Sequence, residues 1–154
     1  MQEHGFYIIK DRFFEKMQDP YLKGNKGQNR PHYYCIRDSE SGLCWMIPLS
    51  SRISKYQKII EKKEQRHQPC DVLHIAKLAN GKESVFLIQD IFPITEEYIE
   101  RAYTIQDIPF VLKNQKLIDV LERKAHTIIG LIKRGIHYMP TQPDVPRIME
   151  KINT

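Results

Sequence analysis

The sequence predicts one α+β domain, in which helices surround an antiparallel sheet. Two stretches of turn-forming residues, residues 38–42 and the pair Asn80 and Gly81, each separate two apolar or β-branched segments, which is the pattern of a β-hairpin. Between residues 110 and 134, apolar side chains recur at helical intervals and predict a long helix. The chain has 154 residues, 41% of them hydrophobic, with no break in composition, so residues 1–154 are expected to share one core.

The strands expected from these patterns cover residues 6–9, 32–37, 43–47, 72–76 and 84–88. If the first hairpin pairs in simple register, Cys35 faces Cys44. Pro48 is expected to end the third strand, because proline fixes φ and lacks the N–H that a strand ladder uses. The two hairpins together predict the antiparallel sheet.

Helices are expected at residues 10–18, 54–66 and 110–134. Ser54 is the expected N-cap of the second helix, and Gly135 is expected to end the third. Thr95 is expected to cap a further helix, because the two acidic residues after it suit the positive end of a helix dipole. Beyond a proline-containing extended segment, residues 147–152 are expected to add one last turn.

The composition argues against several classes of protein. No apolar run is long enough to cross a bilayer, and the N-terminus lacks the pattern of a signal peptide, so a cytoplasmic protein is expected. Cys35, Cys44 and Cys70 lack the CxxC spacing of a zinc site and are expected to be free thiols. Four histidines have no cysteine or carboxylate at metal-ligand spacing, namely His67, His74, His126 and His137, and no Gly-rich phosphate loop, HExxH or GxSxG motif occurs. Neither a metal nor a cofactor is therefore expected.

The positive charge of the chain is concentrated in its first half. Residues 10–68 hold 13 Lys or Arg against seven Asp or Glu, whereas residues 69–154 hold 11 of each. Within the first half, residues 21–32 contain Lys23, Lys26 and Arg30 but no acidic residue. Such a segment is typical of a loop that wraps a polyanion, and also of a solvated surface loop. Composition alone favours neither interpretation.

The segment at residues 43–56 is the most informative for function. An apolar strand there is followed by two hydroxyls, Ser50 and Ser51, and two cations, Arg52 and Lys55. Where a loop meets a helix, backbone N–H groups and such side chains can converge on a phosphate, so this segment predicts a phosphodiester site. The alternatives are that the serines only cap the helix and that Lys55 is a solvated helix side chain.

RNA can be cut without a metal, because its 2′-hydroxyl attacks the adjacent phosphorus when a base removes the proton and an acid protonates the leaving oxygen. Cations must offset the charge that develops on the phosphoryl oxygens. Lys55 could serve as acid, base or charge stabiliser, and His32 is the other titratable candidate unless it is only a surface histidine. Tyr33 and Tyr56 could stack on unpaired bases, although tyrosines that alternate along a strand also pack in cores.

Four segments, FYII, LKGN, NRPHYYCI and GLCWMIPLSSRISKY, occur in an order that resembles the ToxN/AbiQ/CptN family of type III toxins, most closely its CptN branch. The resemblance is sharpest over residues 6–56. It implies a strongly bent antiparallel sheet or small open barrel like that of MazF/Kid toxins, with surrounding helices and a long C-terminal helix. It also implies a metal-independent endoribonuclease that acts in phage defence. Such a toxin is inhibited in a closed protein–RNA assembly by a repeated pseudoknot RNA antitoxin, which it cuts from a longer precursor.

By position, the resemblance places the family's active-site hydroxyls on Ser50 and Ser51 and its downstream lysine on Lys55. His32 falls where some relatives have lysine, and Arg52 where relatives can have proline, so that Arg52 could add a phosphate contact or bend the loop differently. Substrate and antitoxin are then expected to share the basic surface of residues 21–66, with Lys23, Lys26 and Arg30 among its cations.

Two other functions are compatible with the residues. One is an RNA-binding module without catalysis, which would use the same cations and tyrosines. The other is a regulator that docks a protein partner on the apolar face of residues 110–132, although a single-domain core needs that face to close.

Overall fold

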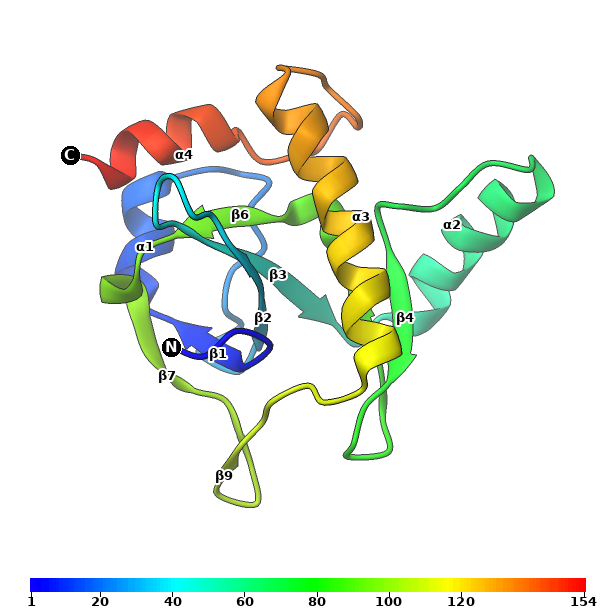
Figure 1. The fold of residues 1–154 in the computed structure, drawn as a ribbon, viewed down its shortest axis with the longest axis horizontal. Coiled ribbons are helices and arrows are strands. Elements are labelled where there is room, and N and C mark those ends of the chain that lie inside the picture. Colours follow the sequence, from blue (N-terminus) through cyan, green and yellow to red (C-terminus); the bar gives the residue numbers. More distant parts are fainter.

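The computed structural model describes residues 1–154 as an open antiparallel sheet with four α-helices around it, which confirms the predicted fold class (Figure 1). The sheet is not closed into a barrel. Its strands are β1 (Phe6–Ile9), β2 (His32–Arg37), β3 (Cys44–Ser50), β4 (His74–Lys77), β5 (Glu83–Phe86), β6 (Phe92–Ile94) and β7 (Ile99–Ala102). The helices are α1 (Asp11–Met17), α2 (Ile53–Gln65), α3 (Gln115–Lys133) and α4 (Val145–Ile152). The smaller elements are the 3₁₀ turns η1 (Ile88–Asp90) and η2 (Glu96–Tyr98) and a separate hairpin, β8 (Thr104–Ile105) and β9 (Ile108–Pro109).

Strand β3 lies at the centre of the sheet and has neighbours on both sides. The strand order is β4-β5-β3-β2-β1-β7, and β6 pairs with β3 beside β5. The first residues of β3, Cys44 to Met46, pair with β6, and its last two, Leu49 and Ser50, pair with β5. The turn η1 lies between these two neighbours in the sequence and contacts β3. Leu87, which precedes η1, donates to the carbonyl of Pro48, so η1 lies next to the last residues of β3.

Pro48 does not end its strand, contrary to the prediction. It lies within β3 and pairs with His32 of β2. Its carbonyl accepts a hydrogen bond from the N–H of Leu87, so its nitrogen faces the side on which η1 interrupts the ladder. On that side no strand residue lies opposite Pro48, so the missing N–H breaks no ladder hydrogen bond.

Three further local predictions are wrong. A bulge between Tyr34 and Ile36 shifts the β2–β3 register, so that Cys44 faces Arg37 rather than Cys35. Thr95 precedes only the short turn η2, which leads directly into β7. Ser54 lies inside α2, which begins at Ile53 after Arg52.

The long helix begins later than predicted but ends as expected. Residues 110–114 are extended, and Phe110 accepts a backbone hydrogen bond from Phe6 of β1. Asn114 caps α3 by accepting from the N–H of Leu117 at 3.3 Å. Gly135 follows the helix with a φ of +70°, a conformation that glycine adopts without steric cost.

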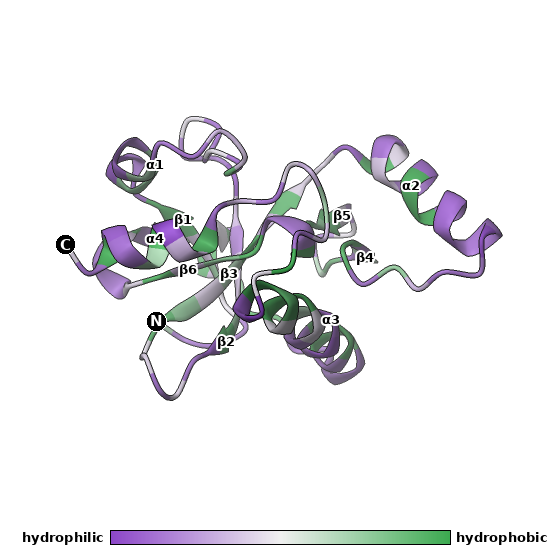
Figure 2. Ribbon diagram, turned by 90° about the horizontal axis from the view of Figure 1, so that it is seen from above, coloured by the Kyte–Doolittle hydropathy of each residue, from purple (hydrophilic) through white to green (hydrophobic).

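Helices cover the sheet in separate places and bury separate hydrophobic clusters. Helix α3 packs on the largest cluster, around Trp45 and Phe86, and α1 and α4 together cover a second, around Phe13 and Phe92. Helix α2 packs on a small third cluster that contains Tyr56. Figure 2 shows α1 and α4 at one end of the molecule and α2 at the other. The end of β3 leads into α2, and the candidate site lies at this junction.

Candidate active site and nucleic-acid interface

The two serines at the end of β3 have different environments. Ser50 is buried, pairs with Val85 of β5, and accepts a hydrogen bond from the N–H of Arg52 on its Oγ at 3.2 Å. Ser51 is exposed, and only its backbone carbonyl is engaged, by the N–H of Ile53 at 2.9 Å. The Ser50 hydroxyl therefore shapes the turn into α2, and the Ser51 hydroxyl is free to contact a bound molecule.

Arg30 connects the basic loop to the end of β3. Its Nε donates to the carbonyl of Gly24 at 2.8 Å, and its Nη1 donates to the carbonyl of Leu49 at 2.6 Å. Partial burial lowers the pKa of the Arg30 guanidinium, and the positive charge of Arg52 acts in the same direction. The Arg30 guanidinium therefore lies beside the turn that contains Ser50 and Ser51, although two of its hydrogen-bond donors already bind backbone carbonyls.

Lys23 and Lys55 complete a group of cations at this junction. Lys55 is exposed on the first turn of α2, with its Nζ 5.1 Å from the centre of the Tyr56 ring. Lys23 is half-buried and lines the same pocket as Lys55. Arg30, Arg52 and Lys55 thus flank the turn that contains Ser51, because Arg30 binds the carbonyl of Leu49, Arg52 follows Ser51 and Lys55 lies on the first turn of α2. Lys23 joins this group through the pocket that it shares with Lys55.

Asp90 is a buried carboxylate among these cations that sequence reasoning did not identify. It ends η1, is 1% exposed, and its Oδ2 has no hydrogen-bond partner. Burial raises the pKa of Asp90 to about 6, although the charges of Lys23, Arg30 and Lys55 oppose the shift. Its signal in the sequence is a polar pair, Gln89 and Asp90, inside an otherwise apolar stretch.

His32 and Tyr33 lie in the core rather than at the junction. The His32 ring is completely buried, between Phe14 of α1 and Phe92 of β6. Burial lowers the pKa of His32 to about 3, so the ring is neutral near pH 7 and has no surface to offer a substrate. Tyr33 is equally buried on the opposite face of the strand, with its hydroxyl 3.0 Å from Nδ1 of His4.

Tyr56 is only partly withdrawn from the site. Its side chain is 4% exposed and belongs to the hydrophobic cluster under α2, yet it contributes to the pocket that Lys23 and Lys55 line. Burial raises the pKa of its phenol, and the negative charge of Asp90 adds to this effect. Tyr56 forms a wall of the pocket rather than an open stacking platform.

The basic loop at residues 21–31 is held in place by Asn25. The buried Asn25 side chain donates to the carbonyl of Ile9 at 3.0 Å and to Asp11 at 2.5 Å. Its backbone carbonyl accepts from the N–H groups of Asn29 and Arg30, both at 2.8 Å. Lys26 lies exposed on the resulting turn with a φ of +50° and does not line the pocket that Lys23 and Lys55 share.

A pocket of about 430 Å³ lies beside Lys55. Its walls come from the loop after α1, the first turns of α2, and the segment that follows α3. Three lysines and three tyrosines contribute to it: Lys23, Lys55, Lys63, Tyr21, Tyr56 and Tyr138. The pocket is therefore positively charged and lined by aromatic rings.

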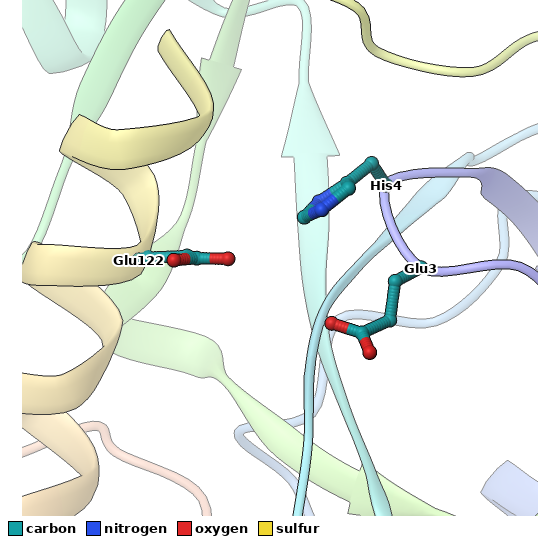
Figure 3. A group of neighbouring side chains, drawn as sticks. All are labelled: Glu3, His4 and Glu122. Atoms are coloured by element: carbon teal, nitrogen blue, oxygen red, sulfur yellow. The ribbon is translucent and has the colours of Figure 1, made fainter. Parts of the chain in front are cut away.

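A separate group of possible metal ligands forms where the N-terminus meets α3. Glu3, His4 and Glu122 each offer one ligand atom, and these atoms lie within 4.8 Å of one another (Figure 3). Glu122 projects from α3 toward the two residues of the N-terminal segment. The spacing of these residues in the sequence does not predict the group, because the fold brings positions 3 and 122 together.

None of the helices is both long and apolar enough to span a membrane.

Comparison with known proteins identifies the fold. No family model matches the chain, and no curated protein matches its sequence. One similar solved structure is ToxN, described with a bacterial antiviral system that a processed non-coding RNA regulates. It has a TM-score of 0.68 and 15% identity, and the match covers 97% of each chain. Another is AbiQ, a lactococcal anti-phage endoribonuclease of the type III toxin-antitoxin system, with a TM-score of 0.69 and 11% identity over 99% of this chain and 97% of AbiQ.

The chain therefore has the fold of the ToxN and AbiQ toxins over nearly its whole length, as the resemblance in its sequence predicts. The closer likeness to the CptN branch stays a prediction.

Proposed function

We propose that this chain is the toxin of a type III toxin-antitoxin system and an endoribonuclease whose active site is the end of β3. The observation that carries the proposal is the exposed hydroxyl of Ser51 in a turn flanked by Arg30, Arg52 and Lys55, with Lys23 in the pocket that Lys55 lines. Single cations are common on protein surfaces, but several beside one exposed hydroxyl form an anion-binding site. The fold shared with two toxins, one of them described as an endoribonuclease, supports RNA as the anion.

The proposed reaction needs no metal ion. The 2′-hydroxyl of the RNA gives its proton to a base and attacks the adjacent phosphorus, the bond to the 5′-oxygen breaks, and this oxygen takes up a proton, so the products are a 2′,3′-cyclic phosphate and a 5′-hydroxyl. Ser51 donates a hydrogen bond to a phosphoryl oxygen, and Lys55 supplies positive charge or a proton. Arg52 and Arg30 add positive charge that stabilises the same developing negative charge.

The same surface is proposed to bind the RNA antitoxin. A repeated pseudoknot RNA would occupy the basic surface of residues 21–66, block the site in a closed protein–RNA assembly, and be cut from its precursor by the toxin. Cellular or phage RNA would be the substrate once the antitoxin is lost. A cytoplasmic location follows from this role, because the RNA partners are there. Binding that depends on phosphate contacts weakens steeply as the salt concentration rises.

Cleavage of a mixed-sequence RNA in EDTA tests this proposal. The expected result is cleavage by the native chain and a loss of at least about a hundredfold in rate for Ser51→Ala and Lys55→Ala. Lys116→Ala is the matched control, because Lys116 is an exposed cation on α3, outside the basic surface of residues 21–66. Cleavage that survives both substitutions would contradict the assigned site. Binding without any cleavage by the native chain would instead indicate an RNA-binding module.

A further inference from the structure

The pocket beside Lys55 has the size of a site for one small planar group. Its volume of about 430 Å³ lies toward the lower end of small-molecule sites, which is too small for a base pair and its backbone. Because the pocket opens next to Lys55, a molecule inside it lies close to the proposed active site. Whatever fills it would therefore be a neighbour of the phosphate that Ser51 and Lys55 bind.

The aromatic lining of the pocket includes one fixed ring and one exposed ring. The hydroxyl of Tyr138 donates to the carbonyl of Gln89 at 2.7 Å, which holds its ring against the pocket. Tyr21, from the loop after α1, is 43% exposed and has no side-chain hydrogen bond. An exposed ring on a wall of the pocket is available for stacking, since every nucleobase has a π-face.

The charges of the lining favour a polyanion rather than a neutral ligand. Lys23, Lys55 and Lys63 contribute ammonium groups, and no acidic side chain lines the pocket. A second pocket, of about 420 Å³, shares Pro20 and Tyr21 with the first but contains Asp19 and Asp144. Only the lysine-lined pocket would attract phosphate groups.

We propose that the lysine-lined pocket binds one unpaired base of the RNA, from a nucleotide next to the bond that is cut. This inference rests on the proposed function. The base stacks on Tyr21, and Lys23 and Lys63 hold the phosphates on its two sides. Gln89 and Thr141 are the uncharged polar residues of the lining and can read the edge of the base. The enzyme therefore cuts beside an unpaired nucleotide rather than within a duplex.

The test uses RNA oligonucleotides from a mapped cleavage site, in which a 2′-deoxy nucleotide blocks the reaction. In each oligonucleotide, one nucleotide next to the cut carries the fluorescent base 2-aminopurine. The two nucleotides before the cut and the two after it are replaced one at a time. Fluorescence anisotropy reports binding, and the 2-aminopurine signal reports stacking. We expect strong quenching at one position, lost in Tyr21→Leu together with roughly fivefold or more of the affinity. Ile136→Ala changes an exposed residue of the adjacent pocket and should alter neither signal.

The outcomes separate this inference from the proposed function. Tight binding without quenching at any position, or quenching that Tyr21→Leu leaves intact, overturns the base pocket while RNA cleavage stands. Stacking on Tyr21 is supported if the quenching is lost in Tyr21→Leu but kept in Lys63→Ala and Ile136→Ala. The phosphate contact of Lys63 is supported if Lys63→Ala binds the RNA more weakly. If the native chain neither binds nor cuts RNA, both proposals fail.

Discussion

At the scale of single residues, Asp90 beside the cations of the site and His32 in the core are both shielded from solvent. Burial raises the pKa of Asp90 and lowers the pKa of His32, because it disfavours the charged form of either group. Their effects on stability therefore have opposite dependences on pH. Each effect can be measured without any substrate.

Replacement of Asp90 by asparagine is expected to stabilise the protein at neutral pH. The folded state keeps the Asp90 proton up to a pKa of about 6, whereas the unfolded chain loses it near 3.8, so the native protein loses stability as the pH rises between these values. The Asp90→Asn variant avoids this loss and should be more stable at pH 7.5 by up to about 3 kcal/mol. Urea unfolding at pH 7.5 and pH 4 measures the difference, which should fall to about 0.5 kcal/mol at pH 4. A less stable variant at pH 7.5 would show that the ionised Asp90 is a net stabilising partner of the cations.

Replacement of His32 by leucine is expected to protect the protein from acid. The pKa of His32 is 6.5 in the unfolded chain but about 3 in the folded protein, because the ring is buried. As the pH falls below 6.5, the unfolded chain binds a proton that the folded protein does not bind, so the native protein loses stability. This contribution amounts to about 2 kcal/mol at pH 5 and should be absent in His32→Leu. Comparison of unfolding at pH 7.5 and pH 5 checks it.

The same variant tests whether His32 takes part in catalysis. A completely buried neutral ring does not reach a substrate, so His32→Leu should keep most of the cleavage activity at pH 7.5. A loss comparable to that of Ser51→Ala would mean that His32 acts in the reaction.

The sequence predicted the hydroxyls and cations of the site better than it predicted which aromatic and titratable groups reach it. Ser51 and Lys55 directly follow β3, so their place depends on local structure alone. His32 is covered by Phe14 and Phe92, which come from elements remote in sequence. Asp90 likewise joins the site only because η1 lies beside the end of β3. Local patterns do not reveal such long-range contacts.

At the scale of elements, the basic loop is an ordered structure despite its lack of helix or strand. Asn25 acts as its anchor, through two side-chain donors that join the loop to β1 and α1. Arg30 fixes its other end to β3. The loop therefore presents Lys23 at a defined place, which favours the interpretation of this segment as a binding surface.

Loss of the Asn25 side chain is expected to release this loop. Asn25→Ala leaves the carbonyl of Ile9 without its donor and should cost about 1 to 3 kcal/mol of stability. Limited proteolysis should then cut within residues 21–31 much faster than in the native chain. Asn29→Ala, at an exposed position of the same loop, is the control and should change stability by less than about 0.5 kcal/mol. Equal protection of the two variants would contradict the anchoring role.

The sequence predicts the helices and strands whose apolar residues recur periodically. It does not predict the elements whose conformation depends on tertiary contacts. The strands of both hairpins and helices α1, α2 and α3 follow their periodicity, although their ends differ by a few residues. Strand β7 was missed because the acidic residues after Thr95 also suit a helix N-terminus. Pro48 can lie within β3 because η1 interrupts the neighbouring strands, and the residues around the proline do not predict η1.

At the scale of the whole molecule, the C-terminal helix α4 closes the end of the sheet opposite α2. Ile148 is completely buried in the cluster that α1 and α4 share, and Arg147 donates to the carbonyl of Met17 at 2.8 Å. The same C-terminal region supplies Tyr138 to the pocket beside Lys55. The chain end thus contributes both to the core and to the candidate interface.

Truncation of Ile148 to alanine is expected to destabilise the fold by about 2 to 5 kcal/mol, because it leaves a cavity under α4. Glu150→Ala changes an exposed residue of the same helix and should have an effect below about 0.5 kcal/mol. Thermal unfolding of the two variants measures both effects. A negligible effect of Ile148→Ala would mean that α4 does not pack on the core as the structure shows.

The most direct test of the central claim is cleavage of an RNA with a single 2′-deoxy nucleotide at its mapped cut site, in EDTA, with the new ends identified by mass spectrometry. The account predicts that the unmodified RNA yields 2′,3′-cyclic phosphate and 5′-hydroxyl ends, and that the 2′-deoxy RNA binds equally well but is not cut at that position. Cleavage of the 2′-deoxy bond, or 5′-phosphate ends that disappear in EDTA, would contradict it.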